Sequence, residues 1–330
     1  MLYVQSDSTD PCYNLALEEY LFSHLADRQN CFMLWQNNKA VIVGKYQNTI
    51  AEINASYVES NHLKVVRRLS GGGAVYHDLG NVNFTFVENR QEGEAFDFAV
   101  FCRPIANALA RLGVEVQISG RNDMTVQGKK FSGNAQYMKR GRVMHHGTIM
   151  FDSDLDAVES ALSPSGEKLE SKGHKSVRSR VTNLKPFIKK EINVTEFRDI
   201  LRDYVAAAHP LQTYSLNADD RAAVETLRDR VYSQWSWNYG FSPVYTHYKS
   251  RYIGGCGKID IYLDIAESGV IHEVAFYGDF FSSDNPQVLS EKLKGCFLER
   301  EALSRVLEGV SIGMFFHNLS TEDFLNALLL

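Results

Sequence analysis

The order of apolar and polar side chains predicts amphipathic helices in the first half of the chain. Residues 14–24 carry apolar side chains three or four positions apart, and Asn14 is the candidate N-cap. Residues 98–112 show the same spacing behind Asp97, a second candidate cap. Pro104 lies inside this segment and is expected to kink the helix or to shift its start.

Further helices are predicted nearer the C-terminus. Residues 193–196 (NVTE) resemble a capping box that opens a helix ending before Pro210. Helical spacing returns over residues 219–232. An Asn-Pro pair at 285–286 precedes another amphipathic helix, and residues 320–323 (STED) cap a last short one.

Apolar runs predict strands in two regions of the chain. Residues 32–35 and 40–43 are apolar runs joined by the polar turn at 36–39. Residues 259–265 place an apolar side chain at every second position, which is the period of a strand. A second strand is predicted around 271–276, so two strands followed by helices indicate a small α+β unit.

Length and composition favour a globular protein with two domains. The 330 residues exceed what one compact core usually takes, and 44% of them are hydrophobic. With the change of pattern near residue 245, this predicts one domain over 1–245 and a second over 246–330. The net charge of −5 argues against a general nucleic-acid binder. The start of the chain does not resemble a signal peptide and no apolar run reaches 18 residues, so we expect a soluble, cytoplasmic protein without a membrane partner.

The most informative motif is the segment 67–78 (RRLSGGGAVYHD), where two arginines precede three consecutive glycines. Glycines weaken the interior of a sheet, so their expected use is a close approach of backbone to a ligand. Arg67 and Arg68 indicate that this ligand is an anion. The motif has neither the Gly-Lys-Ser/Thr ending of a P-loop nor the Gly-x-Gly-x-x-Gly pattern, which excludes a conventional nucleotide loop.

Three further segments carry candidate chemistry. Asp123 lies on a turn-like sequence, and Lys129 and Lys130 stand between glycines, which suits either a phosphate contact or a plain hairpin turn. The adjacent histidines at 145–146 face opposite sides of a strand, so metal ligation by the pair is not expected. Residues 168–190 hold eight Lys or Arg against one Glu, and this exposed loop is either solvated or closes over an anion.

Taken together, these motifs resemble the signature of lipoate–protein ligases. The glycine motif is accompanied, in the order typical of that family, by NLALEE at 14–19, GRND at 120–123, KFSG at 130–133, HHGT at 145–148 and SVRSRVTN at 176–183. The tail from about residue 246 resembles the accessory C-terminal domain of two-domain ligases. The resemblance implies an α+β chain with the biotin/lipoate–protein ligase fold, a mixed sheet with flanking helices similar to class II aminoacyl-tRNA synthetases, plus a small α+β C-terminal domain.

The resemblance also implies a two-step reaction that uses ATP and Mg²⁺. Lipoate, or octanoate in its place, would be activated as an acyl adenylate with release of pyrophosphate. The acyl group would then pass to a lysine of an apo lipoyl domain, in 2-oxoacid dehydrogenase acyltransferase subunits or the glycine cleavage H protein. The first step brings two anions together, so it needs cations and open backbone rather than a covalent nucleophile.

Single residues take expected roles from the same resemblance. Lys130 is the expected catalytic residue and contacts both the acyl carbonyl and the α-phosphate, whereas Lys129 is peripheral. The other residues implied for ATP are Arg68, Gly73, Ala74, Val75, Tyr76, Asn83, Asp123, Lys175, Arg178 and Arg180, with Asp123 also the candidate Mg²⁺ contact. The residues implied for lipoate are Trp35, Arg68, Ser70, Gly71, Gly72, His77, Lys130 and His146, with His145 as the runner-up to His146.

Three alternatives remain open from the sequence. An amidotransferase of the same fold would work without ATP through a cysteine thioester, but none of the five cysteines lies in a matched motif. A non-catalytic protein that binds lipoyl domains would be favoured by loss of Lys130 or of the glycines, and both are present. Biotin ligation is disfavoured because biotin ligases carry a more basic glycine-arginine loop.

Overall fold

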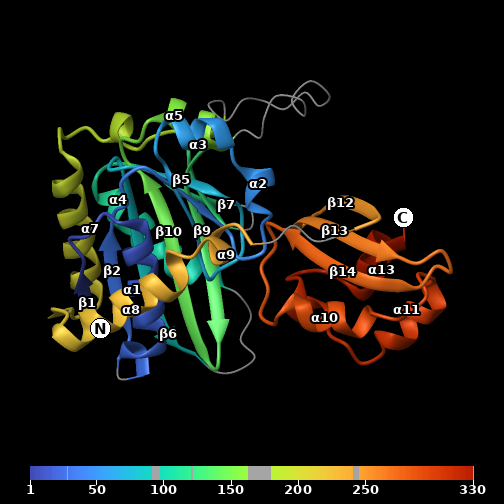
Figure 1. Ribbon diagram of the computed structural model, residues 1–330. Coiled ribbons are helices and arrows are strands. Elements are labelled where there is room, and N and C mark those ends of the chain that lie inside the picture. The colour runs from blue at the N-terminus through green and yellow to red at the C-terminus, as the bar shows by residue number, and fades with distance from the viewer. Residues whose placement is uncertain (28, 91–96, 120–121, 163–179, 241–244, 330) are drawn as a thin grey trace.

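The computed structural model describes residues 1–330 except 28, 91–96, 120–121, 163–179, 241–244 and 330. Figure 1 shows a larger body formed by the N-terminal two-thirds of the chain and a smaller unit, orange to red, at its side. The larger body contains an eight-stranded and a three-stranded sheet, and the smaller unit contains another three-stranded sheet.

The eight-stranded sheet forms the centre of the larger body, with strand order β11-β1-β2-β6-β10-β9-β8-β7. Its strands are β1 (Leu2–Gln5), β2 (Cys31–Trp35), β6 (Asn81–Asn89), β7 (Gln117–Ser119), β8 (Asp123–Val126), β9 (Lys129–Lys139), β10 (Arg142–Met150) and β11 (Gln212–Tyr214). β1 pairs in parallel with β2 and β11, and the other pairs are antiparallel. The sheet is therefore mixed, as predicted.

The smaller sheet of this body carries the glycine motif. It consists of β3 (Ala40–Val43) between β4 (Lys64–Arg67) and β5 (Val75–His77), with β4 parallel and β5 antiparallel to β3. The two predicted strands at 32–35 and 40–43 are both present, but they pair in different sheets. Both runs are apolar throughout and buried throughout, so their sequence carries no information about which neighbour each one pairs with.

Helices cover both faces of the central sheet (Figure 1). On one face α1 (Pro11–Ser23) packs with α8 (Ala218–Leu227) and the π-helical turn η4 (Arg228–Tyr232). On the other face lie α4 (Phe98–Arg111) and α7 (Val194–Ala208). The shorter elements are η1 (Leu25–Asp27), α2 (Thr49–Glu52), α3 (Ala55–Ser60), α5 (Leu155–Leu162), η3 (Lys185–Phe187) and α9 (Trp235–Asn238).

Most predicted helix starts are confirmed, and one is wrong. The side chains of Asp97 and Asn193 accept backbone N–H groups at the starts of α4 and α7, and Asn193 forms the expected capping box. α4 begins at Phe98 and continues through Pro104, so this proline does not shift its start. α1 begins three residues before the predicted cap Asn14, because Pro11 supplies a helical φ at its first position.

The C-terminal unit is an antiparallel sheet covered by helices. Its strands are β12 (His247–Ile253), β13 (Gly257–Ile265) and β14 (Ile271–Gly278), and its helices are α10 (Pro286–Leu293), α11 (Arg300–Val306), α12 (Ile312–Phe315) and α13 (Thr321–Leu329). β12 was not predicted, because this edge strand is half exposed and its sequence HYKSRYI is mostly polar. The predicted helix over 219–232 is α8 followed by the π-helical turn.

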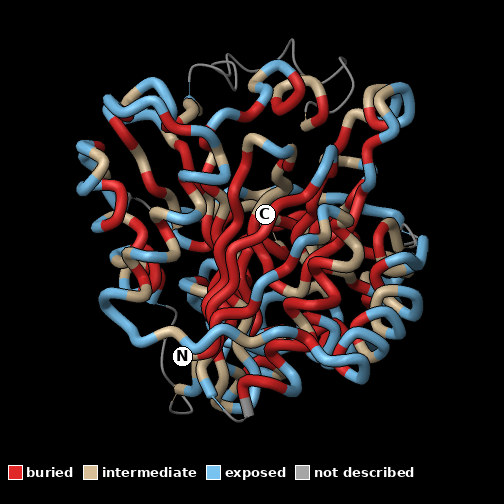
Figure 2. Tube along the Cα trace, turned by 90° about the vertical axis from the view of Figure 1, so that its left-hand side faces the viewer, coloured by how far each residue is buried: buried red, intermediate tan, exposed pale blue. Residues whose placement is uncertain are grey.

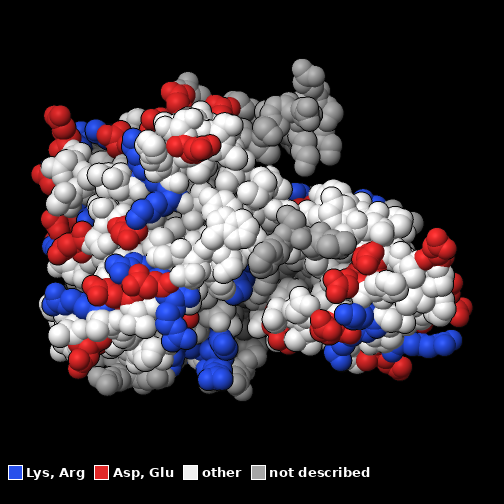
Figure 3. All heavy atoms as spheres, in the orientation of Figure 1, with Lys and Arg blue, Asp and Glu red and all other residues white. Residues whose placement is uncertain are grey.

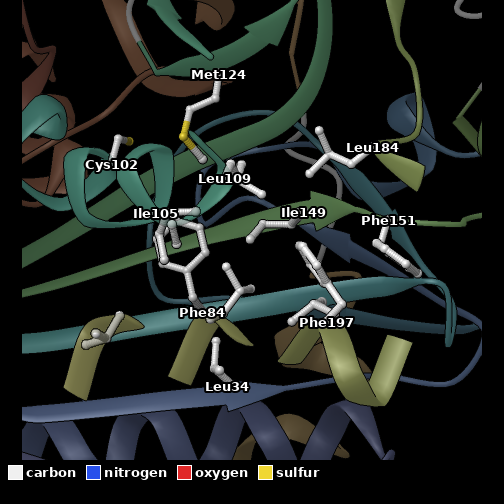
Figure 4. Close-up of a cluster of buried hydrophobic side chains, with 14 of the residues drawn as sticks. Leu34, Phe84, Cys102, Ile105, Leu109, Met124, Ile149, Phe151, Leu184 and Phe197 are labelled. Carbon is white, nitrogen blue, oxygen red and sulfur yellow. The ribbon is translucent and has the colours of Figure 1, made fainter. Parts of the chain in front are cut away.

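Buried residues run through the centre of the fold (Figure 2). On the α4 and α7 face of the sheet, strand residues such as Leu34, Phe84 and Ile149 point toward Ile105 of α4 and Phe197 of α7 (Figure 4). Burying each such side chain contributes roughly 1.5–3 kcal/mol. This core leaves the opposite face of β6, β9 and β10 to carry polar groups near the glycine motif.

The surface mixes charges of both signs. Figure 3 shows Lys and Arg interspersed with Asp and Glu over the larger body and over the C-terminal unit. Among the described helices, none has the length and apolar character needed to cross a bilayer.

Candidate functional site

Two adjoining chambers lie where the glycine motif faces the central sheet. The first holds about 570 Å³ of empty space, part of it open to solvent. It is lined by Leu15, Trp35, Ile42, Arg68, Gly73, Ala74, Val75, His77, Asn83, Asn122, Lys130, Gly133, Asn134, Ala135, His146, Gly147 and Thr148.

The second chamber is larger, at about 1210 Å³ counted with its open mouth. It is lined by Ala74, Val75, Tyr76, Asn81, Asp123, Thr125, Gly128, Lys130, Gly133, Thr148, Met150, Val158, Leu162, Arg180 and Val181. Among the described residues, five line both chambers: Ala74, Val75, Lys130, Gly133 and Thr148. The two chambers therefore meet at the ammonium-bearing side chain of Lys130.

The structure brings most of the sequence-predicted residues to these chambers. Those in the first are Trp35, Arg68, Gly73, Ala74, Val75, His77, Asn83, Lys130 and His146, and those in the second are Ala74, Val75, Tyr76, Asp123, Lys130 and Arg180. Lys175 and Arg178 lie outside the described residues. Ser70, Gly71 and Gly72 line neither chamber. Ser70 stands behind His146, and the two glycines face the C-terminal unit.

Lys130 is held at the junction by local backbone geometry. It follows the tight turn at Gln127 and Gly128, both in the left-handed region, so its side chain leaves the first residues of β9. Its Nζ lies 2.7 Å from Oδ1 of Asp123. A Cβ built on Gly133 would lie 3.1 Å from the same Nζ, so the lysine folds over a residue that has no side chain. Asp123 begins strand β8, which corrects the prediction that it lies on a turn.

The described end of the basic segment lies beside this lysine. The backbone N–H of Thr182 donates to the carbonyl oxygen of Lys130 at 2.8 Å, and Val181 forms an isolated parallel bridge with Lys130. Arg180, which precedes them, lines the second chamber and is exposed. This contact gives the second chamber a second cation.

His146 is the centre of a buried hydrogen-bond network. The Ser70 hydroxyl accepts from Nε of Arg68 at 3.1 Å and lies 2.7 Å from Nε2 of His146. Nδ1 of His146 carries a proton and donates to the carboxylate of Glu18, at 3.0 and 3.1 Å from its two oxygens, because a carboxylate can only accept. The network fixes both the tautomer and the orientation of the ring.

The carboxylate of Glu18 also reaches the indole that lines the first chamber. The hydroxyl of Thr85 donates to Glu18 at 2.5 Å and accepts from Nε1 of Trp35 at 2.9 Å. Glu18 and Thr85 are 1% exposed, so this chain of bonds is completely sheltered. Neither residue was among the predicted site residues. The NLALEE motif was the available signal for Glu18, because it places a carboxylate on the buried face of a helix.

His77 is held in the opposite tautomer. Nδ2 of Asn14 donates to Oδ1 of Asn37 at 2.9 Å, which turns the Asn37 amide nitrogen toward Nδ1 of His77 at 3.1 Å. The ring proton of His77 is therefore on Nε2, which has no hydrogen-bond partner among the described residues. Burial, and next the charge of Arg68, lower the pKa of His77 to about 3. The chamber is thus lined by a neutral imidazole with a spare donor.

His145 belongs to the hydrophobic core and not to the site. It lies on the opposite face of β10 from His146, stacked between Phe84 and Phe101. Its Nδ1 is 3.0 Å from the side-chain nitrogen of Gln136, and burial lowers its pKa well below the usual value. Of the two histidines, His146 is the one placed in the first chamber.

The two adjacent arginines differ in position: Arg68 lines the first chamber and Arg67 lines neither chamber. This corrects the expectation that both face an anion. Arg67 lines neither chamber and donates to the carbonyl oxygens of Gly44, Lys45, Gln47, Trp237 and Asn238 and to the hydroxyl of Thr49. Arg68 lines the first chamber and donates to the carbonyl oxygens of Ile42, Gly71 and Gly73. Burial lowers the pKa of each to about 10, so both remain charged at neutral pH. Their main effect in this structure is to shape the backbone.

The three glycines also have different uses. A Cβ on Gly71 would lie 2.2 Å from the carbonyl oxygen of Phe280, in the C-terminal unit. Gly72 has a φ of +87° and lies against the Phe281 ring. Gly73 has no neighbour within 4 Å of the position its Cβ would take, and it lines the first chamber. Of the three glycines, Gly73 is the one whose backbone is open to the first chamber, whereas Gly71 and Gly72 admit another part of the chain.

Two asparagines on β6 complete the floor of the site. Nδ2 of Asn81 donates to Oδ1 of Asn83 at 2.9 Å, while Oδ1 of Asn81 and Nδ2 of Asn83 have no partner among the described residues. Asn83 lines the first chamber and Asn81 the second. Asn81 was missed in the sequence because no motif distinguishes it from a strand-start asparagine. No group of three or more His, Cys, Asp or Glu capable of holding a metal occurs within the described ranges.

Comparisons with known proteins agree with this architecture. The family model "Lipoyl protein ligase A/B catalytic domain" matches residues 10–206, and "Bacterial lipoate protein ligase C-terminus" matches residues 242–328. Lipoate-protein ligase LplJ of Bacillus subtilis is 42% identical over 334 residues, covering 99% of this chain and 100% of the relative. Lipoate–protein ligase 1 of Staphylococcus aureus is 36% identical, covering 97% of each chain.

Solved structures share the fold. Plasmodium falciparum LipL1, solved with lipoate, superposes with a TM-score of 0.80 at 23% identity, covering 99% of this chain and 98% of that one. A lipoate-protein ligase A bound with ATP superposes with a TM-score of 0.61 at 24% identity, covering 72% of this chain and 97% of that one. At these identities the two structures establish the fold.

The mixed sheet, the accessory C-terminal unit and the matched domains define a protein ligase of the lipoyl class. The chain belongs to the lipoate–protein ligase family. It is an enzyme that joins lipoate to protein through an amide bond, which confirms the predicted fold and activity.

Proposed function

We propose that this ligase works in two steps on either side of Lys130, with lipoate in the first chamber and ATP in the second. The observation that carries the proposal is the junction itself, where one lysine side chain lines both chambers. A carboxylate at the end of the first chamber and an α-phosphate in the second would meet at this ammonium. The structure of a related ligase with ATP bound and that of another with lipoate support the choice of substrates.

In the first step Lys130 and Arg180 neutralise the two anions that must approach each other. The carboxylate oxygen attacks the α-phosphorus, pyrophosphate leaves, and the acyl adenylate remains. This chemistry needs positioning and charge compensation, which preorganised cations supply without reorganising during the reaction. Asp123 holds Lys130 in place before the substrates arrive.

The far end of the first chamber takes the acyl chain. Trp35, His77 and His146 line this chamber and are absent from the second, so they lie away from the junction. The bonds that fix the Trp35 indole and the two imidazoles keep this wall rigid. The spare Nε2–H of His77 offers the bound acid one hydrogen bond.

The second chamber offers two oxygen ligands for Mg²⁺ among its described lining residues. Asp123 supplies the one carboxylate among the described lining residues, and Asn81 has an unpartnered amide oxygen nearby on the lining. Mg²⁺ commonly takes one or two protein oxygens and completes its shell with water and phosphate. These two residues would hold the ion, which would neutralise phosphate charge.

In the second step an apo lipoyl domain delivers a lysine amine to the acyl carbonyl and AMP leaves. The acceptors we propose are 2-oxoacid dehydrogenase acyltransferase subunits and the glycine cleavage H protein. An archaeal bipartite ligase whose structure is described with its E2 lipoyl domain supports this class of acceptor; it is 25% identical and superposes with a TM-score of 0.64.

The cysteines argue against transfer through a thioester. All five lie within the described residues, and none lines either chamber. Burial raises the pKa of Cys31 to about 11 and that of Cys102 to about 12, so these thiols are not nucleophilic at neutral pH. The route through an adenylate is therefore favoured over an ATP-independent amidotransferase.

Substitution of Lys130 tests the proposal. Lys130→Ala should abolish pyrophosphate release that depends on lipoate, ATP and Mg²⁺. The free energy of unfolding should change by less than about 0.5 kcal/mol, because 37% of the Lys130 side chain is exposed to solvent. The matched control is Lys129→Ala, since this adjacent lysine is exposed and lines neither chamber. Normal pyrophosphate release by Lys130→Ala would sink the assignment. Adenylate formation without transfer to an apo lipoyl domain would remove the second step.

A further inference from the structure

The C-terminal unit reaches the site through two adjacent buried residues, Phe280 and Phe281, which are fully buried. A Cβ on Gly71 would lie 2.2 Å from the carbonyl oxygen of Phe280, so no side chain fits there. The Phe281 ring lies 3.3 Å from the position of a Cβ on Gly72. The glycine loop therefore has a ligand chamber on one side and the C-terminal unit on the other.

Phe281 also reaches the wall of the first chamber. It forms a small buried cluster with Phe98 of α4 and Ala135 of β9, and its ring centroid lies 5.2 Å from that of Phe98. Ala135 lines the first chamber and pairs with His146 across β9 and β10. The phenyl ring is thus packed directly behind a lining residue.

The position of the two phenylalanines is fixed from several directions. The ring of Phe280 stacks on Tyr46 with centroids 4.9 Å apart, and the backbone N–H of Gly278 donates to the carbonyl oxygen of Tyr46 at 2.7 Å. On the far side, His317 donates its backbone N–H to the carbonyl oxygen of Phe281 at 2.9 Å. These contacts hold the ring against the chamber wall from outside.

We propose that Phe281 is a positioning residue for acyl binding, supplied to the catalytic body by the C-terminal unit. Its ring supports Ala135 and Gly72 and so sets the width of the first chamber. Close-packed interiors transmit such support, because a vacated volume lets neighbouring groups relax into it. The proposal rests on the assignment of the first chamber to the acyl chain.

The test measures pyrophosphate release by the full chain with lipoate and ATP varied separately. In Phe281→Ala the KM for lipoate should rise about tenfold, as expected when a hydrophobic pocket loses its fit. The KM for ATP should stay within about twofold, because Phe281 lies behind the first chamber only. Phe281→Leu should give an intermediate shift in the KM for lipoate, and it keeps the test valid if the alanine variant does not fold.

Two further variants separate the explanations. Phe324→Ala removes the same side chain from the core of the C-terminal unit, where Phe324 contacts Phe276 and Phe316, and should lower stability without changing the KM for lipoate. The proposal would be overturned if Phe324→Ala raised the KM for lipoate as much as Phe281→Ala does. It would also be overturned if Phe281→Ala raised the KM for ATP in parallel with that for lipoate. Trp35→Val tests the chamber itself. If Trp35→Val shifts the KM for lipoate and Phe281→Ala does not, the proposed role of Phe281 is wrong while the assignment of the first chamber to the acyl chain still holds. If neither variant shifts it, the acyl assignment fails.

Discussion

At the scale of single residues, two histidines in one site are held in opposite tautomers. His146 carries its proton on Nδ1 because the Glu18 carboxylate accepts from Nδ1, and Ser70 lies at hydrogen-bond distance from Nε2. His77 carries its proton on Nε2 because Asn37 donates to Nδ1. Each tautomer follows from a neighbouring side chain, the Glu18 carboxylate for His146 and the Asn37 amide for His77. The site therefore presents one imidazole that is fully bonded and one that retains a donor for substrate.

Gly133 gives a residue-scale prediction. A methyl group at this position would lie 3.1 Å from Nζ of Lys130, so Gly133→Ala should push the ammonium by a few tenths of an ångström. Adenylate formation should then fall about tenfold, because charge compensation depends on position. The free energy of unfolding should change by less than about 0.5 kcal/mol, since a flexible lysine end can move aside.

Gly254→Ala is the control for that prediction, because no atom lies within 4 Å of its added methyl group. It should keep full activity in the same pyrophosphate assay. An unchanged rate for Gly133→Ala would show that the packing of Lys130 on this glycine has no catalytic consequence.

At the scale of elements, strand β9 lines the chambers and also contacts the C-terminal unit. Its first residues hold Lys130 at the junction of the chambers, and its middle presents Ala135 to the first chamber and to Phe281. β10 beside it places His146 on the site and His145 in the core, since successive side chains of a strand face opposite ways. The pair of strands thus links substrate binding to core packing.

Helix α7 gives the element-scale prediction. The side chain of Asn193 accepts from the backbone N–H groups of Thr195 and Glu196 at 2.9 and 3.0 Å, and the helix buries Phe197. Asn193→Ala should lower the free energy of unfolding by about 1 kcal/mol. Activity should stay unchanged because α7 lines neither chamber.

Denaturant unfolding followed by circular dichroism measures this effect. Glu191→Ala, at a nearby exposed position outside the helix, is the control and should leave the unfolding midpoint in place. If both variants unfold at the wild-type midpoint, the capping box does not stabilise the folded protein.

At the scale of the whole molecule, burial of polar groups determines how stability depends on pH. Burial lowers the pKa of His77 to about 3 and that of His145 well below the usual value near 6.5. The unfolded chain therefore binds more protons than the native protein below pH 6.5. The stabilisation from these neutral histidines is complete above pH 6.5 and is lost as pH falls from 6.5 toward 3.

The free energy of unfolding should consequently fall between pH 7 and pH 5 by about 2 kcal/mol for each buried histidine. Denaturant titrations at the two pH values measure this loss. In His77→Gln the loss of unfolding free energy between the two pH values should be smaller than in wild type by the contribution of His77, about 2 kcal/mol. An identical pH dependence in wild type and variant would contradict the assignment of a low pKa to His77.

Much of the site was predictable because its chemistry depends on local sequence. The glycine motif, the lysine pair and the His-His pair stand out by residue type and spacing, and the family resemblance then assigned Lys130 and His146 to the site. The structure places Gly73, Lys130 and His146 on the lining of the first chamber. Glu18 and Asn81 were missed, because a buried carboxylate and a strand asparagine acquire their role only from partners distant in sequence. The predicted boundary between residues 245 and 246 stays a prediction.

The sequence by itself determined many of the helices, several of the strands and the residue types that are available for charge compensation. Periodicity and caps act over a few residues, so they can be read directly along the chain. Only the tertiary structure decided that Arg67 braces backbone, that Gly71 and Gly72 admit Phe280 and Phe281, and that the two histidines take opposite tautomers. These outcomes depend on groups far apart in sequence, and the energy of close packing and buried hydrogen bonds exists only once those groups meet.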